Sequence, residues 1–321
     1  MKTLRYAVLL ATSLALAGCN NRAPEQGNAA AAESKGAARP APSRTGYADV
    51  GGARFYYQIY GDLGSSKTPL LVLHGSYMSA DAMAPIIDQF AKSRPVIALD
   101  ARGHGRTGDL PGPITYPQLA DDAAGVLDAL KVPKADVLGY SMGGVTAIEM
   151  AVRHPDKVGK QIILSGTSRR DGWLPEINAA LEKTTPEQMA GTPFADDYKR
   201  LSPTPTAFPI LVGKLKGLDA SNYDMPDSAI RAIHDKTMIV AGDTDGVQLE
   251  HAVELFKLRG GGDTKTAAQG FMTEAPRARL LILPGTTHIG IMASAEAIAQ
   301  LGVPFLDDVT PPLAPGFLKA K

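Results

Sequence analysis

A serine at position 141 lies between two glycines, in a segment 139–143 that reads G-Y-S-M-G. This segment follows the strand-like stretch 135–138 and precedes a helical pattern, so it predicts the tight strand-to-helix turn called a nucleophile elbow. Such a turn holds the serine hydroxyl out above a sheet, where a base can reach it. A glycine-rich turn without chemistry is the alternative interpretation. The strand before it and the helix after it favour Ser141 as a nucleophile.

A serine hydroxyl is a poor nucleophile at neutral pH and needs a neighbouring base. His288 follows the apolar run 280–283, which we interpret as the last strand, and it lies on the loop where a base is required. We therefore predict that His288 is the base. The other histidines are predicted to be structural in loops (His74 and His104), at a helix end (His154), or solvated on helices (His234 and His251).

An imidazole base needs a carboxylate that fixes its tautomer and stabilises its charged form. The strand-like segment 237–242 ends in Asp243-Thr244-Asp245. Both aspartates are candidates, and we favour Asp245 because it lies further out on the loop, where it can bend towards the histidine. Asp243 is then expected to fix the turn. Asp171 is a third, more distant choice.

Acyl transfer also needs hydrogen-bond donors aimed at the developing oxyanion. The backbone N–H of Met142 is one candidate, since it follows the serine and begins the predicted helix. The second is expected from the loop after the strand 70–73, with the N–H of Ser76 first and that of Tyr77 next. Backbone donors depend on loop position rather than on side-chain identity.

The elements that must position these residues alternate between strand-like and helix-like patterns. Continuous short apolar runs are typical of strands buried on both faces of a parallel sheet, and they occur at 70–73, 96–99, 137–138, 162–164, 238–240 and 280–283. Helix-like stretches lie between most of them, at 116–130, 144–153 and 249–258. Repeated strand–helix–strand order predicts right-handed crossovers. Two further strands, 47–50 and 54–60, flank Gly51-Gly52 and predict a hairpin.

One long insert, 167–236, interrupts this alternation and has no clear strand. A structureless loop of that length would be unusual, so the insert predicts a small helical subdomain. Its aromatic residues are interpreted either as pocket walls or as the subdomain's own core, and the second reading is favoured for each of Trp173, Phe194, Phe208 and Tyr223.

The first residues predict export. A basic start, a short apolar run and small residues make residues 1–18 a secretory signal peptide rather than a membrane span. Cys19, the only cysteine of the chain, follows Leu-Ala-Gly and resembles the lipidated cysteine of bacterial lipoproteins. An ordinary signal peptide with a leftover cysteine is the alternative. Residues 19–45 are rich in Ala, Gly and Pro and predict a lipidated, flexible linker to a cell-envelope membrane, the outer membrane in a diderm bacterium.

Composition argues against one class of partner. The 321 residues carry a formal net charge of zero, whereas a nucleic-acid-binding protein usually has a basic excess. We therefore expect no nucleic-acid partner.

Four sequence blocks together resemble the α/β-hydrolase superfamily: L-H-G-S at 73–76, D-A-R-G-H-G-R-T at 100–107, the elbow, and G-D-T-D at 242–245 with P-G-T-T-H at 284–288. The chain order Ser, Asp, His is also that of the family. The resemblance implies a mostly parallel central sheet flanked by helices, with a helical cap inserted after the sixth strand. It places the core at 46–166 and 237–308, the cap at 167–236 and a tail at 309–321, and it makes the block 100–107 a structural turn.

The chain departs from the motifs of several groups within this superfamily, and these departures argue against their activities. Ser141 argues against dehalogenases and epoxide hydrolases of this fold, which use an aspartate nucleophile. Met142 differs from the tryptophan usual in proline iminopeptidases, and the residues after Ser76 do not match ring-cleavage hydrolases. Methionine after the serine is similar to esterases and to cofactor-free haloperoxidases.

These residues predict a hydrolase of small or medium carboxylic esters, with lactones as further candidates, that works through an acyl-enzyme and needs no metal or organic cofactor. Activity is expected to fall below about pH 6, because imidazole protonates there. A non-catalytic surface lipoprotein that binds a ligand is the alternative from another class. A perhydrolase or haloperoxidase-like enzyme is the alternative among enzymes.

Overall fold

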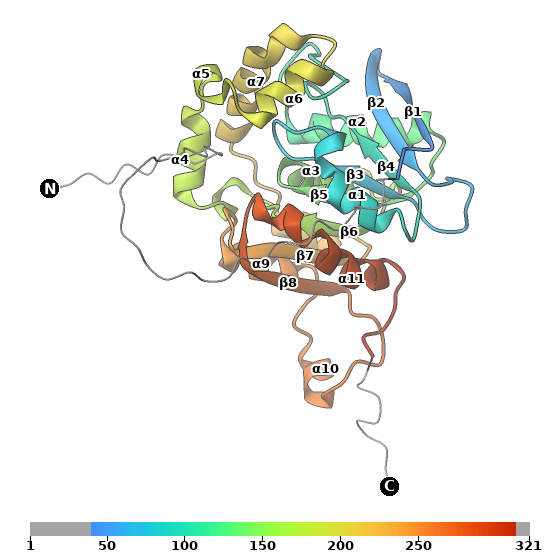
Figure 1. Ribbon diagram of the computed structural model, residues 1–321. Helices are drawn as coiled ribbons and strands as arrows, with labels where there is room; N and C mark the ends of the chain where they lie inside the picture. Colours follow the sequence, from blue (N-terminus) through green and yellow to red (C-terminus); the bar gives the residue numbers. More distant parts are fainter. Residues whose placement is uncertain (1–39, 313–321) are drawn as a thin grey trace, which may run out of the picture.

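The computed structural model describes residues 40–312 and contains one eight-stranded sheet in the order β1-β2-β4-β3-β5-β6-β7-β8 (Figure 1). Strand β2 pairs antiparallel with β1 and with β4, and all other neighbours are parallel. The strands are β1 Arg44–Val50, β2 Ala53–Tyr60, β3 Leu70–Leu73, β4 Val96–Leu99, β5 Ala135–Tyr140, β6 Val158–Leu164, β7 Thr237–Thr244 and β8 Ala278–Thr287.

The predicted parallel strands are present because their apolar runs are covered on both faces. Every residue of β3, β4 and β5 is buried. In β3, Leu70 and Val72 belong to one core cluster, whereas Leu71 and Leu73 belong to the other. Successive side chains of a strand point to opposite faces, so a continuous apolar run is what a doubly covered sheet requires.

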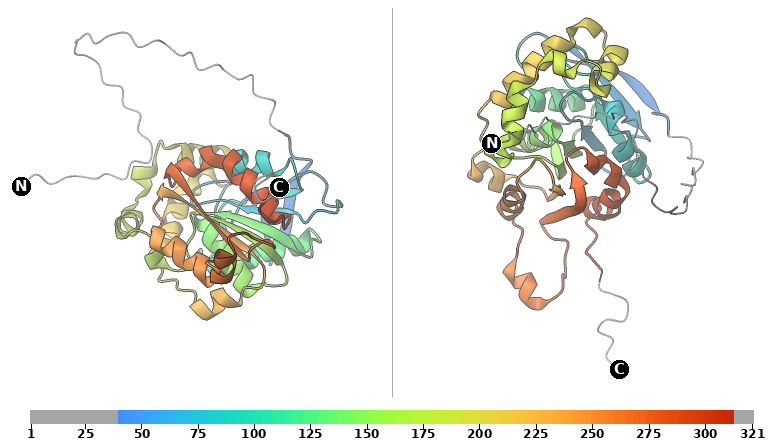
Figure 2. Two further views of the ribbon diagram at one scale, coloured as in Figure 1. Left: turned by 90° about the horizontal axis from the view of Figure 1, so that it is seen from below. Right: turned by 60° about the vertical axis from the view of Figure 1, so that its left-hand side comes forward.

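Helices cover both faces of the sheet (Figures 1 and 2). One face carries α1 Ala84–Phe90 and α11 Ala295–Leu306, whose apolar residues share a core with Leu70 and Val72. The other carries α2 Tyr116–Ala129, α3 Met142–Arg153 and α9 Leu249–Leu258. The sequence patterns predicted α2, α3 and α9 but not α1, α11 or the short α10 Thr264–Gln269.

The insert between β6 and β7 is helical, as expected, and contains α4 Pro175–Lys183, α5 Pro186–Met189, α6 Pro193–Leu201, α7 Phe208–Ala220 and α8 Asp227–Ala232. Helices α4, α5, α6 and α7 gather at one end of the molecule (Figure 1), whereas α8 packs against α3 and α9. Helices α4, α5 and α6 each begin with a proline, whose missing N–H costs nothing in the first turn. Thr185 and Thr192 cap α5 and α6 by accepting a backbone N–H.

Aromatic residues of this insert pack into a core that the insert shares with the sheet and its helices. Phe208 is buried in the larger core cluster, and Phe194 and Tyr223 pack against that cluster. Trp173 is also buried but lies next to the candidate site described below. Within residues 40–312, no helix has the length and apolar character needed to cross a membrane. The predicted signal peptide, Cys19 and most of the linker lie outside the described residues.

Candidate active site

Ser141 lies in the turn between β5 and α3, with a φ of 55° and a ψ of −117°. The turn leaves no room for a side chain at Gly139 or Gly143, two residues before and two residues after the serine. A Cβ on Gly139 would lie 2.0 Å from the backbone oxygen of Gly143, and a Cβ on Gly143 would lie 2.2 Å from the oxygen of Leu73. A positive φ on a residue other than glycine is unfavourable, and such strain is concentrated at functional sites. The predicted elbow is therefore present.

His288 lies directly after β8, and the Nε2 atom of its imidazole is 3.0 Å from the hydroxyl oxygen of Ser141. The two residues are 147 positions apart in the sequence. Their strands, β5 and β8, both end at the same edge of the sheet, where parallel strands present their carboxyl ends and ligands usually bind. The structure therefore brings the predicted nucleophile and the predicted base into hydrogen-bonding distance.

Asp245 is the carboxylate that meets this imidazole. Its Oδ1 atom lies 2.7 Å from Nδ1 of His288, and its side chain is fully buried. Its Oδ2 atom accepts hydrogen bonds from the hydroxyl of Ser165 and from the N–H of Gly242, and the N–H of Val247 donates to Oδ1. Burial acts to raise the pKa of Asp245, but the bond to His288, its charge and the bonds from Ser165 and Gly242 lower that pKa below its ordinary value. The carboxylate is thus held in its charged form.

The two other aspartates considered from the sequence lie elsewhere. Asp243 is exposed and accepts hydrogen bonds from the N–H groups of Gly285 and Thr286, at 2.8 and 3.1 Å. It therefore fixes the turn, as expected for the aspartate that does not meet the imidazole. The exposed Asp171 makes an ion pair of 2.6 Å with Arg169.

Two backbone N–H groups are available for an oxyanion. Within residues 40–312, neither the N–H of Met142, at the start of α3, nor the N–H of Ser76 donates a hydrogen bond. The N–H of Tyr77 donates to Nε2 of His104 at 3.2 Å. The choice of Ser76 over Tyr77 therefore agrees with the hydrogen bonding of this loop.

His74 and His104 hold the loop in place, which agrees with the structural role expected for them. Both are buried, their rings lie 5.0 Å apart, and Nε2 of His74 accepts the N–H of Ala101. Burial lowers the pKa of His74 to about 4, and burial together with the neighbouring His74 lowers that of His104 to about 3. Both imidazoles are therefore neutral at pH 7, as an acceptor nitrogen requires.

The prediction for His251 was wrong. It is not solvated but only 3% exposed, and its Nε2 atom accepts a hydrogen bond from the N–H of Ser168. The reason is that α9 turns this residue towards the chain that leaves β6, where Gly172 leaves room for the ring.

Two residues of the site, Tyr140 and Ser165, were missed in the sequence, and Trp173, for which the core of the insert was the favoured interpretation, lies beside the base. Tyr140 and Trp173 place aromatic rings 5.1 and 5.4 Å from the imidazole of His288. Ser165 follows β6 directly, and this position was its only signal, because a residue after a parallel strand lies at the edge where the site forms.

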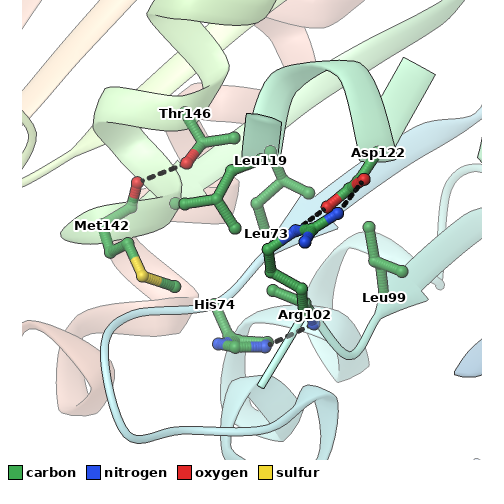
Figure 3. Close-up of a pocket in the computed structure, with 10 residues that line it drawn as sticks. Leu73, His74, Leu99, Arg102, Leu119, Asp122, Met142 and Thr146 are labelled. Carbon is green, nitrogen blue, oxygen red and sulfur yellow. Dashed lines mark hydrogen bonds and ion pairs between the residues drawn. The ribbon is translucent and has the colours of Figure 1, made fainter. Parts of the chain in front are cut away.

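A small cavity is lined by Met142, His74 and Arg102 among others, and its lining does not include Ser141, Asp245 or His288 (Figure 3). Its volume is about 10 Å³, which is room for a single water molecule. Arg102 and Asp122 close it with two parallel hydrogen bonds of 2.5 and 2.8 Å. Arg102 thus ties the loop after β4 to α2, which agrees with a structural role for the block 100–107.

The comparisons with known proteins agree with this fold. Residues 68–229, about half of the chain, match the family model described as the alpha/beta hydrolase fold. A protein from Azorhizobium caulinodans that carries a provisional assignment as the carbamate hydrolase RutD is 38% identical over 128 residues, which are 40% of this chain and 47% of that relative. The chain thus matches less than half of the length of this curated relative.

Solved structures resemble a larger part of the chain. The enol-lactonase from Burkholderia xenovorans LB400 superposes with a TM-score of 0.60 at 23% identity, covering 82% of this chain and all of that one. The carboxylesterase CesB from Bacillus subtilis gives a TM-score of 0.61 at 18% identity, covering 84% of this chain and 93% of that one. At such identities the likeness shows the shared fold alone.

Proposed function

Because this chain belongs to the alpha/beta hydrolase family, we propose that it is a serine hydrolase that cleaves carboxylic esters, including lactones, through an acyl-enzyme. The observation that carries the proposal is the continuous hydrogen-bonded path from Ser141 Oγ through His288 to Asp245, with distances of 3.0 and 2.7 Å. Nucleophile, base and orienting carboxylate are the parts that acyl transfer needs.

The proposed reaction has two steps. The imidazole of His288 accepts the proton of Ser141 while the serine oxygen attacks the ester carbonyl, and the imidazolium then protonates the leaving alcohol. A water molecule, activated by the same imidazole, releases the acyl group from Ser141. In both steps the N–H groups of Met142 and Ser76 stabilise the oxyanion, and the charged Asp245 stabilises the imidazolium.

Two exposed apolar residues follow residues of the site in the chain. Ile289 follows His288 and is 52% exposed, and Leu174 follows the buried Trp173 and is 38% exposed. The names of the solved relatives, a lactonase and a carboxylesterase, are consistent with a carbonyl substrate.

A fluorophosphonate probe and a series of p-nitrophenyl esters and lactones of graded chain length test the proposal. We expect the probe to label the wild-type chain, and we expect Ser141→Ala and His288→Gln to lose both labelling and hydrolysis. Ser228→Ala, an exposed serine of α8, is the matched control and should behave like the wild type. Absence of labelling in folded wild-type protein would instead favour a protein that only binds a ligand.

We further propose that the chain is exported and anchored to a cell-envelope membrane through a lipid on Cys19. The support is the order of basic residues, short apolar run and small residues before this single cysteine. A polar, proline-containing linker between the anchor and the fold would let the enzyme reach substrates near the membrane.

A further inference from the structure

Two aromatic rings contact the imidazole of His288. The ring of Tyr140 lies 5.1 Å away and is tilted by 31°, and the ring of Trp173 lies 5.4 Å away at 73°, an edge-to-face arrangement. Aromatic contacts of this kind are stabilising and restrict ring orientation. The hydrogen bonds of His288 fix its two nitrogens, so these ring contacts restrict the remaining tilt of the imidazole.

Tyr140 is held by the nucleophile elbow itself. It precedes Ser141 in the chain, it is 3% exposed, and its hydroxyl donates a hydrogen bond of 3.0 Å to the backbone oxygen of His288. The nucleophile and the base are therefore joined by a second connection, which runs through backbone rather than through the reacting atoms.

Trp173 is held by the insert. Its indole Nε1 donates a hydrogen bond of 2.8 Å to the hydroxyl oxygen of Tyr223, which also lies 2.5 Å from the hydroxyl of Thr167. Thr167 and Trp173 lie at the beginning of the helical insert, whereas Tyr223 lies near its end, between α7 and α8. The bond between Trp173 and Tyr223 thus joins the two ends of the insert beside the imidazole.

The backbone around Trp173 is also joined to the loop that carries Asp245. The N–H of Leu174 donates to the oxygen of Gly246 at 2.8 Å, the N–H of Gln248 donates to the oxygen of Gly172 at 2.9 Å, and Trp173 forms an antiparallel bridge with Val247. The same three-residue segment therefore contacts the base through its side chain and the carboxylate loop through its backbone.

We propose that Trp173 is a positioning residue for His288. Through the hydrogen bond between Trp173 and Tyr223, the alignment of the imidazole with Ser141 depends on the position of the insert relative to the sheet. This inference rests on the proposed function. A shift of the insert would move the indole away from the imidazole, and a misplacement of about 1 Å at a reacting group costs about 100-fold in rate. The insert would then control the rate of the reaction as well as cover the site.

Three variants separate positioning from simple packing. Tyr223→Phe removes the hydrogen bond but keeps both rings, and we expect kcat for p-nitrophenyl acetate to fall by about 3- to 10-fold. Trp173→Phe keeps a smaller ring, and Trp173→Ala removes the contact; we expect losses in kcat of about 10-fold and about 100-fold. KM should change by less than about 3-fold in all three. Tyr47→Phe, at an exposed tyrosine of β1, is the matched control.

The chain contains a single tryptophan, so its fluorescence reports on Trp173 alone. An imidazole in contact with an indole changes the emission of that indole. We expect the emission at constant pH to differ between the wild type and His288→Gln. In Tyr223→Phe the emission and kcat should change together.

Two results would overturn the inference. One is wild-type kcat and an unchanged pH profile in Trp173→Ala that folds with the thermal midpoint of the wild type. The other is an emission of Trp173 that is the same in wild type and His288→Gln. Fluorophosphonate labelling of the wild type separates this failure from a failure of the proposed function, because a labelled Ser141 would show that the enzyme is active regardless of Trp173.

Discussion

The proposed catalytic role of His288 depends on which of two neighbouring aspartates is hydrogen-bonded to its imidazole. Asp245 lies 2.7 Å from His288 with its side chain buried, whereas Asp243 is exposed and bonded to the backbone of the turn after Leu283. A charged carboxylate against Nδ1 keeps Nε2 free to accept a proton. The two aspartates therefore have separable roles.

Exchange of each aspartate for asparagine tests this separation. We expect Asp245→Asn to lower kcat by about 10²- to 10⁴-fold, because the neutral amide no longer selects the required tautomer or stabilises the imidazolium. Asp243→Asn should lose far less activity, since one amide oxygen can still accept a bond from Gly285 or Thr286. Steady-state hydrolysis of p-nitrophenyl acetate measures both. Equal losses in the two variants would contradict the assignment.

The buried histidines predict how the stability of the protein depends on pH. Burial lowers the pKa of His74 from 6.5 to about 4, so between these values the unfolded chain binds a proton that the folded chain excludes. The free energy of unfolding is therefore unaffected by this group above pH 6.5. It decreases by an amount on the order of 3 kcal/mol as the pH falls from 6.5 towards 4.

Urea unfolding of the wild type and of His74→Gln at a series of pH values measures this effect. Glutamine can still accept the N–H of Ala101 but does not titrate, so we expect a smaller fall in the free energy of unfolding of the variant below pH 6.5. The same dependence on pH in both proteins would show that His74 is not the group responsible.

Among single residues, the sequence predicted the positions of Ser141, Asp245 and His288 because each follows a recognisable strand. It did not predict Tyr140 or Ser165, and for Trp173 the favoured interpretation was the core of the insert. Their contacts join residues up to 148 positions apart, as in the bond from Tyr140 to His288. A local pattern carries no information about such partners.

At the level of elements, the strand–turn–helix unit of β5 and α3 sets the position of the nucleophile. The atoms nearest to an added Cβ are all backbone atoms, those of Gly143 and Gly144 for Gly139 and those of Leu73 and His74 for Gly143. No flexible side chain there could move aside. By contrast, a glycine in the cap helix α7, Gly213, has nothing within 4 Å of an added Cβ. Substitution by alanine should therefore lower the stability of the fold at Gly139 and raise it at Gly213.

We expect Gly139→Ala to destabilise the fold by about 3 kcal/mol or more and to abolish hydrolysis, because the new Cβ would lie 2.0 Å from the oxygen of Gly143. Gly213→Ala should raise stability by up to about 1 kcal/mol, since alanine favours a helix over glycine. Thermal and urea unfolding provide the measurement. A folded, active Gly139→Ala would show that the elbow is not as tight as described.

The elements themselves were partly predictable. Continuous apolar runs identified the parallel strands, because a doubly covered sheet demands them, and amphipathic spacing identified α2, α3 and α9. The patterns missed α1 and α11. Helix α11 contains the internal proline Pro304, and α1 is only seven residues long, so neither gives a sustained helical period.

At the scale of the whole molecule, one sheet edge collects the loops after β3, β5, β6, β7 and β8, and the insert after β6 lies next to that edge. Family resemblance, rather than periodicity, placed a cap there. The position of the cap on the sheet edge could not be predicted. Gly172 and Leu174 pair with the loop after Asp245 through backbone hydrogen bonds, which any sequence can make.

The proposed anchor gives a prediction at this scale. We expect cells that express the wild-type chain to incorporate labelled palmitate into it and to hold it in the membrane fraction, whereas Cys19→Ser should lose the label and the membrane association. Hydrolysis by the folded part should be the same in both. Membrane association without label in both proteins would contradict a lipid on Cys19.

The most direct test of the central proposal is the detection of the acyl-enzyme. We predict that wild-type protein mixed with p-nitrophenyl acetate and quenched within the first turnover gains the mass of one acetyl group on the peptide that contains Ser141, together with a burst of p-nitrophenol. Ser141→Ala should show neither. Hydrolysis that persists unchanged in Ser141→Ala would contradict the proposal.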